Sequence, residues 1–165
     1  MRTAYAQTTK PIHAHEKFYL VITGASLTHS LLNFSQRGFN APSRLQLSSN
    51  ARTALGEHNT ERFAELSTLK DGWHFGQGNT LQAASLRAME LFLAQYHSFP
   101  ERCSLFLSEQ GNLELVWRSE ENETTSLEFY PDRIEYYIET LDKEGEVAIR
   151  DISTLVQTLA HAYSE

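Results

Sequence analysis

Apolar and polar residues alternate with a period of two between residues 103 and 149, which is typical of strands that bury one face. The connections between these segments, with "DKEG" expected as the turn before the last strand, contain the Gly, Pro, Asp or Asn that a tight turn needs. The pattern predicts an antiparallel β-meander of four to five strands. The positions expected to face the core are Leu113, Leu115, Trp117, Leu127, Phe129, Ile134, Tyr136, Ile138, Val147 and Ile149.

The opposite positions of the same strands carry mainly acidic and aromatic side chains. An antiparallel sheet can leave one face in water, so these side chains are expected on the solvent side. They are Glu114, Arg118, Glu128, Tyr130, Glu135, Tyr137 and Glu139. The sequence therefore predicts an acidic sheet face that contains tyrosines.

Three other segments have apolar residues at helical spacing. One is expected to begin with Asn59 or Thr60 as its N-cap, because both residue types cap helices well. The segment 80–97 is apolar around most of its circumference, so we expect a helix that packs on more than one side. The third follows Asp151 and should cover the apolar side of the sheet. Together these elements predict an α+β fold with two to three helices.

The N-terminal part has weaker patterning. The first 16 residues are polar and predict an arm, "KFYLVIT" predicts a strand, and "SLTHSLLNF" predicts a short helix. Gly, Pro and Asn in "SQRGFNAPSR" predict a loop. We therefore expect an N-terminal extension over residues 1–58 and an α+β core domain over residues 59–165.

The composition is that of an ordinary globular chain, with 41% hydrophobic and 21% charged residues among 165. The longest apolar run, "FYLVI", is too short to span a bilayer, and the residues before it do not form a signal peptide. Cys103 is the single cysteine, so an intramolecular disulfide is excluded. These features predict a soluble, cytoplasmic protein with no membrane contact.

The net charge of −7 is unevenly distributed along the chain. Residues 1–60 have a balance of +4, whereas residues 109–146 have a balance of −9. Such asymmetry indicates either an interaction surface or a solvated face that keeps the protein soluble, and both interpretations stay open. Direct nucleic-acid binding is disfavoured, because an acidic sheet face repels phosphate.

The segment "LKDGWHFGQGNT" joins two of the expected helices. Asp71 and Gly72 favour a turn that ends the first helix, and the later glycines let the chain bend before the second. An anion site at "GQGNT" is the alternative, but the glycine spacing matches no phosphate-binding motif and no lysine follows. Trp73 is expected to be a structural plug. His74 and Phe75 are expected either to pack beside it or to form an exposed contact patch.

In this region the sequence resembles a widespread group of small bacterial proteins. Members carry Leu-x-x-Gly-Trp-Asp-Gly-x-Gly before a helix, and then a meander with Asp-Gly-x-Ile-x-Leu-x-Trp. The resemblance covers about residues 60–160, with His74 and Phe75 where the group has Asp and Gly, and "QGN" at its Asp-Gly turn. It implies the α+β fold and an association with mobile or defence-related genes. It transfers no catalytic residues.

Candidate chemistry is sparse. "HAH" at residues 13–15 has a spacing that metal sites use, but the further ligands that zinc requires are missing. "PDRIEYYIETLDK" resembles a nuclease motif, yet Leu141 stands where a metal-binding carboxylate is needed. No Gly-x-Ser-x-Gly motif is present. We therefore predict no catalytic residue, no metal ligand and no cofactor.

These features favour a non-catalytic protein–protein interaction module, such as an accessory, antitoxin-like or inhibitor component of a bacterial or phage conflict system. The expected partner is a protein with a basic groove, and the alternative partner is a second copy of the chain. Alternatives are a small hydrolase or nuclease that uses His74, or a structural homo-oligomer. The residues predicted to contact a partner are Trp73, His74, Phe75, Glu114, Glu128, Tyr130, Glu135, Tyr137 and Glu139.

Overall fold

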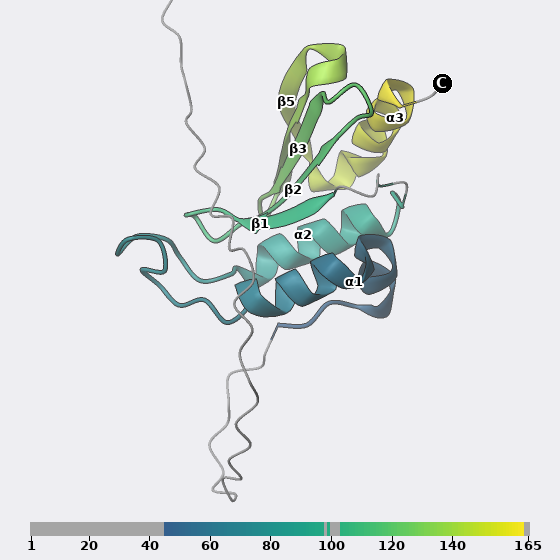
Figure 1. Ribbon diagram of the computed structural model, residues 1–165. Helices are drawn as coiled ribbons and strands as arrows, with labels where there is room; N and C mark the ends of the chain where they lie inside the picture. The colour runs from purple at the N-terminus through teal and green to yellow at the C-terminus, as the bar shows by residue number, and fades with distance from the viewer. Residues whose placement is uncertain (1–44, 98, 100–102, 164–165) are drawn as a thin grey trace, which may run out of the picture. The chain divides into compact units, whose positions relative to one another are not determined.

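The structure is a computed structural model that describes residues 45–97, 99 and 103–163 (Figure 1). In this part of the chain, three α-helices and a five-stranded antiparallel sheet confirm the α+β prediction. The arm, strand and helix predicted before residue 45 lie outside the described residues. The elements are α1 (Ser49–Leu66), α2 (Ala83–Leu93), β1 (Ser104–Leu107), β2 (Leu113–Arg118), β3 (Thr124–Phe129), β4 (Arg133–Ile138), the 3₁₀ turn η1 (Glu139–Leu141), β5 (Lys143–Ala148), the 3₁₀ turn η2 (Ile149–Asp151) and α3 (Ile152–Ala162).

The strands follow one another across the sheet in the order β1-β2-β3-β4-β5, so the predicted meander is confirmed. The register aligns inward-facing residues of neighbouring strands in rows, with Leu113 opposite Phe129 and Phe129 opposite Ile134. All three side chains are fully buried. Apolar positions separated by two along each strand therefore form one continuous core surface.

The helices cover the apolar side of this sheet. The helix α2 contacts β2, β3 and α1, which confirms that it packs on more than one side. Its neighbour α1 also contacts the edge strand β1, and α3 packs against β5 (Figure 1). Near the end of α3, Tyr163 lies with its ring 6.4 Å from that of Trp117. The core thus lies between the helices and one face of the sheet.

The first helix begins eleven or twelve residues earlier than an N-cap at Asn59 or Thr60 would place it. Its N-cap is Ser48, whose hydroxyl accepts a hydrogen bond from the Ala51 amide. Gly56 interrupts the helix with φ of +73°, so the 18 residues form two helical pieces. This break explains why a single helical period does not extend across the segment. The domain boundary expected after residue 58 falls inside α1.

Asn59 was expected to be an N-cap, and this expectation is wrong. The residue is 4% exposed and lies inside α1. Its amide nitrogen donates to the carbonyls of Leu55 and Cys103, and its amide oxygen accepts from the Leu105 amide. Asn59 therefore joins α1 to the strand at the edge of the sheet.

Two further boundaries differ from the sequence pattern. The second helix begins at Ala83, because Asn79 and Thr80 belong to the preceding loop. The segment "DKEG" was expected to be the turn before the last strand, but its Lys143–Gly145 part already pairs with β4. Asp142, with φ of +47°, and η1 make the turn instead.

Within the described residues, no helix has both the length and the apolar character that crossing a lipid bilayer requires.

Candidate interaction surfaces

The loop between α1 and α2 contains a two-residue β-hairpin. The His74 amide donates to the Gln77 carbonyl at 3.0 Å, and the Gln77 amide donates back to the His74 carbonyl at 2.8 Å. Phe75 and Gly76, between them, have φ of +50° and +85°. Positive φ at both central residues defines a type I′ turn, which favours Asn-Gly over a bulky first residue.

Phe75 is the outermost large side chain of this loop, with 93% of its surface exposed. A left-handed backbone costs a residue with a Cβ about 1–2 kcal/mol. The side chain also gives up the stability that burial of an aromatic ring provides. The loop projects beyond the ends of α1 and α2 (Figure 1). Phe75 therefore lowers the stability of the fold in two ways, through its strained backbone and through its exposed ring.

The base of the loop is rigid. The Gly72 amide donates to the Gly78 carbonyl at 2.7 Å, and the Trp73 indole N–H donates to the Asn79 carbonyl at 3.1 Å. A Cβ on Gly78 would lie 2.7 Å from the indole nitrogen, so the ring rests directly on the backbone. Trp73 is partly buried against the core. Its role in the structure is to support the hairpin.

The loop is also fastened to the turn between β1 and β2. The Asn79 amide donates to the Glu109 carbonyl at 2.8 Å, and the Gln82 amide donates to the Gly111 carbonyl at 2.9 Å. The Thr80 amide donates to the Asp71 carboxylate at 2.8 Å. Amides that an anion at "GQGNT" would need are thus already used within the protein.

His74 makes a polar contact that sequence spacing did not indicate. Its Nδ1 lies 2.7 Å from a carboxylate oxygen of Glu109, 35 residues away. The imidazole also lies 5.5 Å from the Trp73 ring and 4.9 Å from the Phe75 ring, centre to centre. The carboxylate holds the imidazole in one orientation. In this orientation the imidazole lies beside the Phe75 ring at the tip of the hairpin.

A second surface lies on the face of the sheet opposite the helices. The register places Glu114, Glu128, Glu135 and Glu146 side by side across β2, β3, β4 and β5. We call these four residues the carboxylate row. Like charges directly opposite one another on neighbouring strands are unfavourable unless they are compensated. The sequence pattern did not single out Glu146, because the last strand was expected to begin at this residue, three residues after its observed start at Lys143.

The members of the row differ in exposure. Glu114 was expected on the solvent side, but it is only 5% exposed. Glu114 does lie on the expected side of the sheet, opposite Glu128. Because it is buried, it does not belong to the accessible part of the row. Glu128 and Glu135 are partly exposed, and Glu146 is exposed. The accessible row therefore consists of the last three carboxylates, with the 38% exposed ring of Tyr137 beside them.

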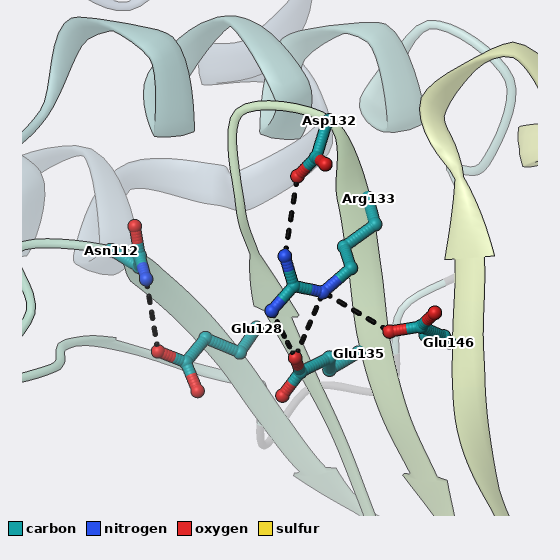
Figure 2. A network of polar contacts seen from close by, with 6 residues as sticks. All are labelled: Asn112, Glu128, Asp132, Arg133, Glu135 and Glu146. Carbon is teal, nitrogen blue, oxygen red and sulfur yellow. Dashed lines mark hydrogen bonds and ion pairs between the residues drawn. The ribbon is translucent and has the colours of Figure 1, made fainter.

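Arg133 compensates part of this charge (Figure 2). Its guanidinium lies 2.6 Å from Glu135 and 3.1 Å from Glu146, and it also reaches Asp132 at 3.3 Å. These contacts, the hydrogen bond to Glu135 foremost, raise the pKa of Arg133. The sequence pattern does not single out Arg133, because the carboxylates that it contacts are identified only by the strand register.

Tyr130 lies against the same network. The guanidinium carbon of Arg133 is 4.1 Å from the centre of the Tyr130 ring, within cation–π distance. The pKa of the Tyr130 phenol is raised by burial first, and then by the charges of and hydrogen bonds to Glu128 and Glu135. The phenol therefore stays protonated and serves as a hydrogen-bond donor to the carboxylates.

Asn112, just before β2, contacts Glu128 of the row. Its side-chain nitrogen donates to Glu128 at 3.3 Å (Figure 2). The residue is 2% exposed, and its side-chain oxygen has no hydrogen-bond partner among the described residues. Glu139 lies apart from the row in η1, where its carboxylate accepts a hydrogen bond from the Thr124 amide at 2.7 Å. It is nevertheless exposed near the end of β4.

Among residues 45–97, 99 and 103–163, no group of three or more His, Cys, Asp and Glu side chains is arranged to hold a metal ion. The "HAH" segment lies outside these residues. Comparisons of the chain with models of known families, with curated proteins and with solved structures give no match.

Proposed function

We propose that this protein is a non-catalytic binding module that engages a basic surface of a partner protein through Glu128, Glu135, Glu146 and the neighbouring tyrosines. The observation that supports the proposal most directly is the alignment of these carboxylates across adjacent strands. Aligned carboxylates produce a negative potential that attracts a basic partner and accelerates its association.

Arg133 illustrates the chemistry that this surface offers to a cation. A guanidinium is bound there by two carboxylates and by the face of Tyr130. Arginine or lysine side chains of a partner would find further acceptors at Glu128 and at the exposed Glu144. A partner whose own function is to bind nucleic acid has such a basic groove. The protein would then act as an accessory, antitoxin-like or inhibitor component.

The proposal is tested by affinity purification from a lysate of the host, at low and high salt, with bound proteins identified by mass spectrometry. The bait is the full chain and a Glu128→Gln/Glu144→Gln/Glu146→Gln variant, which leaves the Arg133–Glu135 contact intact. A matched control neutralises three exposed glutamates of α1: Glu57, Glu61 and Glu65. We expect a basic partner that high salt releases and that the sheet variant alone fails to retain. Equal retention by all three proteins would refute binding through this face.

A hydrolase or nuclease that uses His74 is the second candidate. The observation that favours it is the Glu109 carboxylate at 2.7 Å from Nδ1, because general-base histidines are oriented in this way. Wild-type protein and His74→Ala are assayed on ester, phosphodiester and nucleic-acid substrates. Turnover by the wild type that the folded variant lacks would establish the enzyme. Absence of wild-type turnover would count against this candidate.

A further inference from the structure

Phe75 has the properties of a pre-organised anchor. The hydrogen bonds of the hairpin, the Trp73 support and the His74–Glu109 contact fix its position before any partner arrives. Pre-organisation lowers the entropy that binding costs. A strained backbone at a fully exposed aromatic residue is an outlier of the kind that marks functional positions.

The same chain has a groove of suitable size beside α1. Its volume is about 340 Å³, and it lies between residues 45–47 and one side of the helix. An apolar cavity of about 150 Å³ is large enough to bind benzene. The groove can therefore accept a phenyl ring. Its lining residues are Leu45, Gln46, Leu47, Arg52, Thr60, Phe63, Ala64 and Ser67.

The charges around the anchor and the groove are complementary. Arg52 is exposed at the groove, and its guanidinium has no carboxylate partner among the described residues. Glu109 is half-exposed beside His74, whose ring contacts Phe75. A phenyl ring in the groove would lie beside Arg52, which can contact an aromatic face and attract a nearby carboxylate. Each of these contacts favours the same pairing.

Other partners fit the loop less well. Lys70 is the one Lys or Arg of the segment 69–80, where Asp71 follows it in the sequence and Glu109 contacts His74. Anionic lipid and nucleic acid both require a cluster of basic side chains around an inserting aromatic residue. The polar and acidic surroundings of Phe75 favour a protein surface instead.

We propose that the protein self-associates by inserting Phe75 of one copy into the groove beside α1 of a second copy. This contact uses neither the carboxylate row nor any partner of that row. A single ring in a single groove buries less than a standard interface, so the association is weak and reversible. It becomes visible at high protein concentration.

The test is sedimentation equilibrium of the full chain from about 10 μM to 1 mM, the range in which weak contacts are measured. We expect the average mass of the wild type to rise with concentration. Phe75→Ser removes the anchor and should weaken association about tenfold or more, as the loss of an aromatic hot spot does. Leu91→Ser, which removes another exposed apolar side chain from α2, is the matched control and should have no effect.

Groove-side variants make the test specific. Ala64→Trp fills the groove from an exposed helical position, and Arg52→Glu reverses its charge. Both variants should weaken association. If circular dichroism shows that Ala64→Trp is unfolded, Arg52→Glu alone tests the groove. A mixture of Phe75→Ser with Ala64→Trp should associate again, because one copy retains the groove and the other retains the anchor.

The proposal is overturned if the wild type is monomeric throughout this range. It is also overturned if Phe75→Ser associates like the wild type, or if Leu91→Ser weakens association to the same extent. The Glu128→Gln/Glu144→Gln/Glu146→Gln variant should self-associate normally. Loss of self-association in that variant would assign the contact to the sheet face instead.

Discussion

Asn59 and Phe75 show how the surroundings of a residue decide its role. Asn59 has the side chain of a helix cap, yet it bonds to the backbone of a strand 44 and 46 residues away. Phe75 has the side chain of a core residue, yet it is exposed at the tip of a hairpin. In both cases the residue type is compatible with several structural roles. Contacts with distant parts of the chain, made by Asn59 itself and by His74 beside Phe75, decide which role is realised.

Replacement of Phe75 by Asn should stabilise the protein. Asn adopts positive φ more easily than Phe, and Asn-Gly is a favoured type I′ pair, so we expect a gain of about 1 kcal/mol in the free energy of unfolding. Denaturant unfolding measures the change. Phe75→Ala should gain less, because Ala lacks the side-chain amide that helps Asn adopt positive φ. A clear loss of stability in the Asn variant would mean that Phe75 has a structural role.

Replacement of Asn59 by Leu should destabilise the protein by about 3 kcal/mol, because it leaves a buried amide and a buried carbonyl without partners. The polar groups affected are the Leu105 amide and the Cys103 carbonyl. Asn50→Leu, at an exposed position of the same helix, is the control. Similar stability of the two variants would contradict the role assigned to Asn59.

At the scale of elements, the loop 70–80 and the β1–β2 turn behave as one unit. Five of the glycines in the described part of the chain have positive φ, three of them in this loop and one in the turn. The turn glycine, Gly111, faces the Thr80 carbonyl, 2.3 Å from where a Cβ would be. The turn and the loop therefore depend on each other for their backbone conformation.

Two glycines of the loop provide a matched comparison. Gly76 and Gly78 both have φ of +85°, but a Cβ meets open space at Gly76 and the Trp73 ring at Gly78. Ala at either position costs the strain of a positive φ, about 1 kcal/mol. Gly78→Ala should cost at least about 1 kcal/mol more, since overpacking adds to the strain.

Denaturant unfolding and tryptophan fluorescence report this difference. Equal stability of the two Ala variants, with unchanged fluorescence, would mean that the indole does not rest on the Gly78 backbone.

At the scale of the whole molecule, the core makes the protein sensitive to alkaline pH. Burial raises the pKa of the Cys103 thiol from 9.0 to about 12. Burial, followed by Tyr163 and Cys103, raises the pKa of Tyr96 from 10.0 to about 12. The unfolded chain releases these protons at lower pH than the folded chain does. Their contribution to stability is therefore complete below pH 9 and is lost as the pH rises toward 12.

The free energy of unfolding should decrease steadily between pH 9 and pH 12, and Cys103→Ala should reduce the slope at the lower end of this range. Denaturant titrations at several pH values measure both slopes. Identical slopes for the two proteins would show that the thiol ionises equally well in the folded state. The thiol should also resist alkylation at neutral pH, because the thiolate is the reactive form.

The α+β class, the five-stranded meander and the buried faces of β2, β3 and β4 were predictable from the sequence. These features follow from alternation and from turn residues, which are local properties of the chain. The predicted core positions Leu113, Leu127 and Ile134 are all fully buried. Element boundaries were less predictable, since Gly56 divides one helix and the turn after β4 forms at Asp142.

The sequence by itself determined which side of the sheet is apolar and where the acidic residues alternate. Only the tertiary structure decided that Glu114 is buried, that Arg133 joins Glu135 to Glu146, and that His74 meets Glu109. The physical reason is the range of the interactions. Periodicity acts between neighbours along the chain, whereas burial and charge pairing depend on strand register and on loops that meet from distant parts of the sequence.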